Sequence, residues 1–266
     1  MNIKKLRLGL LGKDVLKSHS PNIHTFILNE WGIECEYDLF SVSPDEFDLA
    51  MRRLMGDFDA FNITIPYKRD VMEYLNEVKG DAFLFSSVNT VISSTAVGYN
   101  TDGVGFMLML RANGIEVGNK KILVLGMGGS GRSTAAVLKQ NGAKVFAYQR
   151  RQEELQETCN EIGVTAVDTP YGAYDILINC TGVGMHKTEG VSPVEARVFD
   201  GASVAVDLIY RPEKSEFLRL AEARGLKICN GEAMLFFQAY YSDCLYVNRQ
   251  PNEAEAQALY EKFKKQ

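Results

Sequence analysis

A glycine-rich loop between a buried strand and a helix is the feature that most restricts how this chain can fold. Residues 121–125 form a continuous apolar strand, and Gly126, Gly128 and Gly129 follow it directly before a helical pattern at 130–141. Gly126 allows a tight turn, and Gly128 lets backbone N–H groups approach a pyrophosphate at the positive end of the helix. The context predicts a dinucleotide site, and the alternative is a tight turn that binds no ligand.

Strand-like and helix-like segments alternate along the rest of the chain, which is typical of α/β folds with mostly parallel sheets. We predict two α/β domains: an N-terminal substrate-binding domain with a mostly parallel sheet, residues 1–102 plus 237–266, and a Rossmann-type dinucleotide-binding domain, residues 103–236. The cleft between them is expected to hold both ligands. The predicted strands are 6–11, 34–42, 60–65, 88–93, 96–99, 121–125, 144–148, 176–180, 203–207 and 226–229. The predicted helices are 21–31, 43–55, 66–78, 102–113, 130–141, 151–162, 213–223, 233–247 and 253–264.

Composition and charge exclude several other classes of protein. Hydrophobic residues make up 46% of the 266 residues, which is enough for one large core or two modest ones. The net charge is -5 and the cationic residues are scattered, which argues against nucleic-acid binding. The apolar runs are far shorter than the ~20 residues of a membrane span. Residues 1–7 lack a secretory cleavage site, and five irregularly spaced cysteines indicate reduced thiols, so we expect a soluble cytoplasmic protein.

The end of the strand after the glycine loop indicates which dinucleotide is bound. An NAD site usually has an acidic residue about 20 residues beyond the loop, where it binds the ribose 2′-hydroxyl. Here the strand leads into Gln149, Arg150 and Arg151. Two guanidinium groups favour a 2′-phosphate, so NADP is predicted in preference to NAD. The alternative for one of the arginines is an ion pair with Glu153 or Glu154 on a solvated helix.

Four polar segments follow strands in the N-terminal half, where ligands collect in open α/β sheets. Each segment alone has an ordinary explanation as a cap or a turn. Together they supply hydroxyl and amide groups for a polyhydroxylated ligand, with one ammonium, Lys68, and one carboxylate, Asp102, that can share a proton transfer. The segments are Ser18-His19-Ser20-Pro21, Asn62 to Lys68, Val88-Asn89-Thr90 and Asn100-Thr101-Asp102-Gly103.

Six motifs have the same order as in one known family of enzymes. They are Ser18-x-Ser20-Pro21-x-x-His24, Asn62-x-Thr64-x-Pro66-x-Lys68, Asn100-Thr101-Asp102-Gly103, Ile178-Asn179-Cys180-Thr181, Asp207-Leu208-Ile209-Tyr210-x-Pro212 and Gly231-x-x-Met234-Leu235-x-x-Gln238. Over nearly its whole length the chain resembles the shikimate dehydrogenase family. The members of this family are NADP-dependent oxidoreductases of aromatic amino-acid biosynthesis, the chorismate pathway.

The resemblance implies a role for each group of residues. Lys68 and Asp102 would be the catalytic pair in the interconversion of 3-dehydroshikimate and shikimate. The substrate would be bound by Ser18, Ser20, Thr64, Asn89, Tyr210 and Gln238, with the two serines on its carboxylate. NADP would be bound by Gly126, Gly128, Gly129, Ser130, Gln149, Arg150, Arg151, Thr181 and Gly231. No metal is needed, and the three histidines form no metal-ligand pattern. The expected partner is the small-molecule substrate, with no nucleic acid or membrane, and the expected state is a monomer or homodimer.

Some residues depart from the family's pattern. Thr25 follows His24 and Gln149 precedes Arg150 where asparagine is usual, and Ser215 replaces a threonine. Gln149 would lie at the adenine-ribose pocket, and family members that also accept quinate resemble this chain in the same motifs. The nearest alternative function is therefore a quinate/shikimate dehydrogenase that uses NAD or both cofactors. An alternative of another class is a non-catalytic, NADP-responsive regulatory protein. The intact pair of Lys68 and Asp102 argues against it, because binding alone requires no proton-transfer groups.

Overall fold

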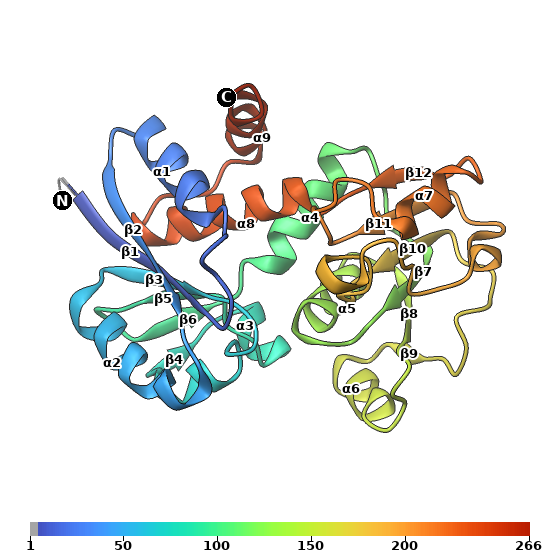
Figure 1. Ribbon diagram of the computed structural model, residues 1–266, viewed down its shortest axis with the longest axis horizontal. Coiled ribbons are helices and arrows are strands. Elements are labelled where there is room, and N and C mark those ends of the chain that lie inside the picture. Colours follow the sequence, from blue (N-terminus) through green and yellow to red (C-terminus); the bar gives the residue numbers. More distant parts are fainter. Residues whose placement is uncertain (1–4) are drawn as a thin grey trace. The chain divides into compact units, whose positions relative to one another are not determined.

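The computed structural model describes residues 5–266, which form two compact units (Figure 1). The first unit combines the N-terminal part of the chain up to Gly105 with Leu235–Gln266, and the second is Phe106–Met234. The chain passes between the units within two helices, α4 (Asp102–Ala112) and α8 (Glu232–Tyr246). Residues 1–4, part of the segment in which we expect no secretory signal, lie outside the described residues.

The first unit has a six-stranded sheet with the order β2-β1-β3-β5-β6-β4. β1 pairs in parallel with β2 and β3, whereas β5 is antiparallel to both β3 and β6. The carboxyl ends of β1, β3 and β6 and the beginning of β5 therefore meet at one edge of the sheet. The strands are β1 (Lys5–Gly12), β2 (Glu34–Ser41), β3 (Ala60–Ile63), β4 (Glu77–Val78), β5 (Thr90–Ile92) and β6 (Val97–Tyr99).

Helices cover both faces of this sheet. On one face, Leu6 and Leu8 of β1 pack with Leu28 of α1 (Ser20–Glu30), and on the other face Leu11 packs with Leu54 of α2 (Phe47–Asp57). This alternation follows from the two-residue period of a strand whose faces are both buried. The short helix α3 (Asp81–Phe85) belongs to the α2 face. Aromatic ring contacts join α9 (Glu253–Phe263) to α1 and α8.

The second unit has an all-parallel sheet with the order β12-β11-β10-β7-β8-β9. The order reverses between β7 and β10, so these strands flank the point where doubly wound folds bind dinucleotides. The strands are β7 (Lys121–Leu125), β8 (Lys144–Tyr148), β9 (Thr165–Ala166), β10 (Ile176–Asn179), β11 (Val204–Asp207) and β12 (Lys227–Cys229). The helices are α5 (Gly129–Gln140), α6 (Leu155–Ile162) and α7 (Glu216–Glu222). The predicted α/β architecture with mostly parallel sheets is confirmed.

The predicted helix at 66–78 is wrong. This segment contains a turn, a five-residue 3-10 helix from Asp70 to Tyr74, and the strand β4. Its backbone groups bind distant parts of the chain instead of forming a helical ladder: the Lys68 carbonyl accepts from the Val88 amide at 2.8 Å, and β4 pairs with β6. Tertiary pairing therefore overrides the local apolar pattern.

Several other bounds differ from the prediction: α2 begins at Phe47, α7 begins at Glu216 and β3 ends at Ile63, not at residues 43, 213 and 65. α6 begins at Leu155 and not at residue 151, because the side chains of Gln149 and Gln152 bind backbone carbonyls of the preceding turn. The strand β9 and the helix α3 have no counterpart among the predicted elements. Among the helices of residues 5–266, none has the length and apolar character needed to cross a bilayer.

Candidate active site

A lysine and a carboxylate meet at the edge of the first unit's sheet. Lys68 lies in the turn after β3, and its Nζ donates to Oδ2 of Asp102, the first residue of α4, over 2.5 Å. The side chains are only 12% and 8% exposed. Partial removal from water strengthens their attraction, and the helix N-terminus stabilises the negative charge of Asp102. The pair is therefore a preformed ammonium–carboxylate couple that can exchange a proton with a bound hydroxyl group.

The Asn89 amide fixes the other oxygen of the same carboxylate. Its Nδ2 donates to Oδ1 of Asp102 and to Oγ1 of Thr101, each over 2.9 Å. Its Oδ1 accepts from the backbone amide of Thr101 at 2.9 Å and from the hydroxyl of Thr90 at 2.8 Å. Asn89 is 2% exposed. Both carboxylate oxygens of Asp102 are thus held, and the reacting couple is rigidly oriented.

Helix α8 adds two polar side chains to this cluster. Oε1 of Gln238 lies 3.4 Å from the Asn89 amide, and Oγ of Ser242 lies 2.8 Å from the Thr90 hydroxyl and 3.1 Å from the Thr101 hydroxyl. Gln238 is one of the predicted substrate residues. Sequence reasoning missed Ser242, because a serine within a helix gives no distinguishing signal until its partners are known.

The predicted carboxylate-binding serines lie at the start of α1. The Ser18 hydroxyl donates to Oγ of Ser20 over 3.1 Å, and the Ser20 amide donates to Oγ of Ser18 over 3.2 Å. Two hydroxyls beside a helix N-terminus form a suitable site for a carboxylate. Thr64 follows β3 at the same sheet edge, where its amide donates to the Leu11 carbonyl over 2.9 Å.

The glycine loop of the second unit leaves space for a ligand at the switch point of the sheet. Gly126 has φ +88°, a conformation that favours glycine, and a Cβ on Gly131 would lie 1.9 Å from the Gly126 carbonyl oxygen. A Cβ on Gly128 would meet no atom within 4 Å. Gly126 and Gly131 are thus required by the fold, whereas Gly128 is open where α5 begins, and a pyrophosphate fits that cradle. Gly129 and Ser130 form the first turn of α5.

Arg150 and Arg151 lie after β8, on the side of the sheet next to this loop. Both are exposed. Within residues 5–266 no carboxylate pairs with either guanidinium, so the alternative of an ion pair with Glu153 or Glu154 is not observed. Gln149 turns back, and its Nε2 donates to the Arg151 carbonyl over 2.6 Å. The two cations are thus available to an anionic ligand.

A buried network holds Thr181 at the other side of the switch point. Oδ1 of Asn179 accepts from the amide and the hydroxyl of Thr181, over 3.0 and 2.6 Å. Its Nδ2 donates to Asp207 over 3.0 Å, and Asp207 also accepts from the Ser215 hydroxyl over 2.5 Å. Burial raises the pKa of Asp207 from 3.8 to about 6, although its hydrogen bonds oppose the rise. Asn179, Asp207 and Ser215 therefore orient the loop after β10.

Two further predicted residues lie near this network. Gly231 follows β12, and a Cβ there would lie 2.1 Å from the Leu208 carbonyl oxygen, so the close approach of two backbone segments requires glycine at this position. Tyr210 is half-buried, and its burial raises the pKa of the phenol.

In the described part of the chain, three or more His, Cys, Asp or Glu residues nowhere form a group that could hold a metal ion.

Comparison with known proteins identifies matching families for both parts of the chain. Residues 10–91 match the family model of the shikimate dehydrogenase substrate binding domain, and residues 104–190 match that of the D-isomer specific 2-hydroxyacid dehydrogenase NAD binding domain. The shikimate dehydrogenase (NADP(+)) of Caldicellulosiruptor bescii is 38% identical over 264 residues, which cover 92% of each chain. That of Clostridium botulinum is 34% identical over 239 residues, 87% of this chain and 93% of the relative.

A solved structure resembles this chain over almost its full length. The crystal structure of shikimate 5-dehydrogenase from Thermus thermophilus, in complex with NADP(H) and shikimate, is 32% identical in sequence with a TM-score of 0.89. The match covers 97% of this chain and 99% of that chain.

Proposed function

The chain belongs to the shikimate dehydrogenase family, and we propose that it catalyses the NADP-dependent interconversion of shikimate and 3-dehydroshikimate in aromatic amino-acid biosynthesis. The observation that carries this proposal is the clamped pair of Lys68 and Asp102, with Asn89 on the second carboxylate oxygen. A binding protein would not need a half-buried ammonium held 2.5 Å from a carboxylate.

The chemistry follows from what this pair can do to a secondary alcohol. The hydroxyl proton must leave as hydride departs from the carbon. The neutral amine form of Lys68 accepts this proton and becomes the ammonium that pairs with the Asp102 carboxylate. In the reverse direction, the Lys68 ammonium stabilises negative charge that develops on the ketone oxygen. The nicotinamide of bound NADP supplies the hydride acceptor.

The substrate is held by hydroxyl and amide groups of the first unit. Ser18 and Ser20 bind its carboxylate, because they present hydroxyl groups at a helix N-terminus. Thr64, Asn89 and Gln238 bind its ring hydroxyls, and Tyr210 is a further proposed substrate-binding residue. We assign the substrate-binding domain to residues 1–102 and 237–266 and the NADP-binding domain to 103–236.

NADP is held by the loop and strand ends of the second unit. The open backbone at Gly128 receives the pyrophosphate, together with Gly126, Gly129 and Ser130 around it. Arg150 and Arg151 bind the 2′-phosphate through charge-assisted hydrogen bonds, with Gln149 beside the adenosine. Thr181 and Gly231 are further proposed cofactor-binding residues.

The remaining proposals concern the cellular setting of the protein. We propose a monomer or homodimer in the cytoplasm that acts without nucleic acid or a membrane. The scattered cations, the net charge of -5 and the five thiol cysteines support this assignment.

A product assay tests the proposed function. Purified protein incubated with shikimate and NADP is expected to form NADPH and 3-dehydroshikimate in equal amounts, measured by absorbance and by mass spectrometry. Failure to form NADPH from shikimate at saturating concentrations of both ligands would contradict the proposal. Turnover of quinate alone would favour the alternative polyol.

A further inference from the structure

A histidine and an aspartate form a fully buried pair between two helices of the first unit. Nδ1 of His24 on α1 lies 2.6 Å from Oδ1 of Asp243 on α8, and both side chains are 0% exposed. Burial raises the pKa of Asp243 from 3.8 to about 6, and His24 opposes the rise. Burying two such groups is costly unless they act on each other. The pair fixes α1, which begins at Ser20, against α8, which carries Gln238.

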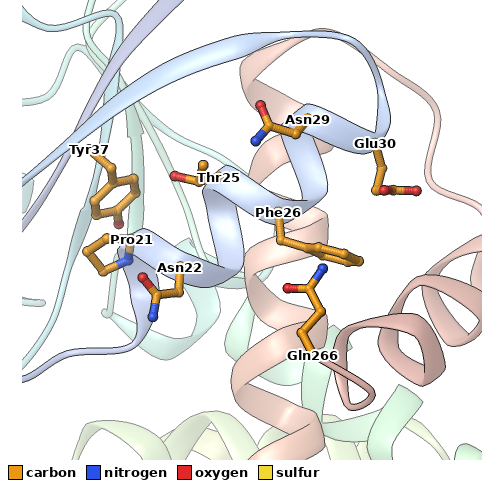
Figure 2. Close-up of a pocket in the computed structure, with 8 residues that line it drawn as sticks. All are labelled: Pro21, Asn22, Thr25, Phe26, Asn29, Glu30, Tyr37 and Gln266. Carbon is orange, nitrogen blue, oxygen red and sulfur yellow. The ribbon is translucent and has the colours of Figure 1, made fainter.

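Tyr37 of β2 lies on this pair. Its ring stacks on the His24 ring, with centroids 4.8 Å apart and an interplanar angle of 20°. Figure 2 shows the Tyr37 ring beside Pro21 at the start of α1, on the border of a surface pocket of about 520 Å³. Stacking on a fixed imidazole leaves the tyrosine ring little freedom to turn, so the position of its hydroxyl is also fixed.

The Tyr37 hydroxyl connects the two sides of the proposed substrate site. It donates to Oδ1 of Asn62 over 2.8 Å. Burial raises the pKa of the Tyr37 phenol, and the nearby Ser20 side chain opposes that rise. Tyr37 therefore lies next to one of the carboxylate-binding serines as well as next to Asn62.

Asn62 passes this constraint to the reacting pair. Its Nδ2 lies 3.1 Å from the Asn89 carbonyl and 3.3 Å from the hydroxyls of Thr90 and Ser242. Because Tyr37 donates to Oδ1 of Asn62, the amide can present only its NH₂ group to Asn89. Asn89 in turn clamps Asp102. The orientation of the Asn89 segment thus depends on the Tyr37 hydroxyl, through Asn62.

We propose that Tyr37, held in place by the buried pair of His24 and Asp243, is a positioning residue that orients Ser20 and Asn62 for binding of the shikimate carboxylate and ring. This inference rests on the proposed function and extends it to residues that do not touch the reacting atoms. It also gives a role to the buried pair of His24 and Asp243, which takes no part in the proposed proton transfer.

Removal of the single hydroxyl tests the proposal. Tyr37→Phe keeps the ring and its stacking on His24. We expect KM for shikimate to rise about 5- to 20-fold, with kcat within about threefold of wild type and KM for NADP unchanged. The reason is that the lost hydrogen bond leaves only the substrate-binding side chains less well ordered. If Tyr37 had only a structural role, Tyr37→Phe would instead lower the melting temperature without raising KM for shikimate more than it changes kcat.

Tyr67→Phe is the matched control. The Tyr67 hydroxyl also makes one 2.8 Å hydrogen bond, to the Val42 carbonyl on the α2 face of the same unit. This variant removes the same atom but is expected to keep both KM values within about twofold of wild type. If KM for shikimate were the same in the Tyr37→Phe and Tyr67→Phe proteins, the proposal would be overturned.

A double variant tests the role of the buried pair. Asp243→Asn is expected to raise KM for shikimate in the wild-type background and to add little in the Tyr37→Phe background, because both changes act through one hydroxyl. Full additivity of the two effects would show that Asp243 does not act through Tyr37 and would overturn that part of the proposal.

Calorimetric titration of shikimate separates failure of this inference from failure of the proposed function. If the wild type bound shikimate without oxidising it, the proposed function would be wrong, and the comparison of dissociation constants between the two tyrosine variants would still decide the inference. Weaker binding by Tyr37→Phe alone supports it, and equal binding by both variants refutes it.

Discussion

At the scale of single residues, Lys68 matters most for the proposed catalysis. This lysine could in principle be an ordinary surface residue, but it is 12% exposed and bound to Asp102. Lys68→Ala is expected to lower kcat about 10²–10⁴-fold, with a smaller change in KM for shikimate. Fluorescence titration should give normal NADP affinity for this variant. Wild-type turnover would remove Lys68 from the catalytic assignment.

Asp102 acts on the same step as Lys68 if the two are a pair. Asp102→Asn keeps the size of the side chain but loses its charge, so kcat is expected to fall strongly. Because both groups serve one proton transfer, the Lys68→Ala/Asp102→Asn double variant should be less impaired than the product of the single losses. Steady-state kinetics of the four proteins decide this, and fully multiplicative losses would show that the residues act independently.

We propose that Arg150 determines the choice between the two dinucleotides. Arg150→Ala is expected to raise KM for NADP by about 10- to 150-fold, which corresponds to about 1.5–3 kcal/mol for a charged hydrogen bond, and to change KM for NAD little. Arg151→Ala is the matched comparison, since both guanidinium groups are exposed on the same turn. A selective effect of Arg151→Ala alone would transfer the 2′-phosphate contact to that residue.

The site residues differ in how much of their role could be predicted from sequence. Lys68 and Asp102 stand out because charged groups follow apolar strands, and the antiparallel β5 brings Asn89 to the same sheet edge. Tyr37 and Asp243 gave no such signal, and His24 was marked only as part of the motif that begins at Ser18. Their importance depends on contacts between residues up to 219 positions apart, such as that of His24 with Asp243, which a local pattern cannot reveal.

At the scale of elements, the turn from β7 into α5 contains glycines with two different roles. Gly131 is needed for backbone packing, and Gly128 leaves open the proposed place of the pyrophosphate. Gly131→Ala would place a methyl group against the Gly126 carbonyl and is expected to destabilise the protein by about 1–3 kcal/mol. Gly128→Ala should leave stability unchanged, because the space is open, but should weaken NADP binding at least tenfold by blocking the pyrophosphate.

Gly118→Ala is the control for the glycine variants, since a Cβ at this exposed loop position also meets no atom within 4 Å. Chemical denaturation and NADP titration of the three variants give the required comparison. Unchanged NADP affinity in the Gly128→Ala protein would contradict the proposed place of the pyrophosphate.

Strongly patterned elements could be predicted from the sequence, whereas β4, β9 and α3 could not. The continuous apolar run of β7 and the helices α5 and α9 lie within about one residue of their expected bounds. The segment 66–78 resembles a helix in the sequence because Pro66 begins it and proline is common at the first position of a helix. Its backbone hydrogen bonds to Val88 and β6 decide its structure, and these partners are distant in sequence.

At the scale of the whole molecule, a buried carboxylate makes stability depend on pH. The pKa of Asp207 is about 6 in the folded chain and near its ordinary 3.8 when unfolded. The folded state therefore binds this proton more tightly, and its contribution to stability is present below about pH 4 and is lost as the pH rises through 6.

Comparison of the wild type with the Asp207→Asn variant isolates this contribution. Titration of Asp243 occurs in both proteins, so its effect cancels in the difference between their free energies of unfolding. The free energy of unfolding of the wild type relative to the variant is expected to fall by about 2 kcal/mol between about pH 4.5 and 7.5. Urea denaturation at several pH values measures it. A difference that stays constant with pH, or grows as the pH rises, would contradict the assigned direction of the Asp207 shift.

The most direct test of the central claim is one panel of kcat/KM values for the wild-type protein with shikimate or quinate and with NADP or NAD. The clamped pair of Lys68 and Asp102 and the exposed guanidinium groups of Arg150 and Arg151 predict the highest kcat/KM for shikimate with NADP. A higher value for quinate with NAD would contradict the account.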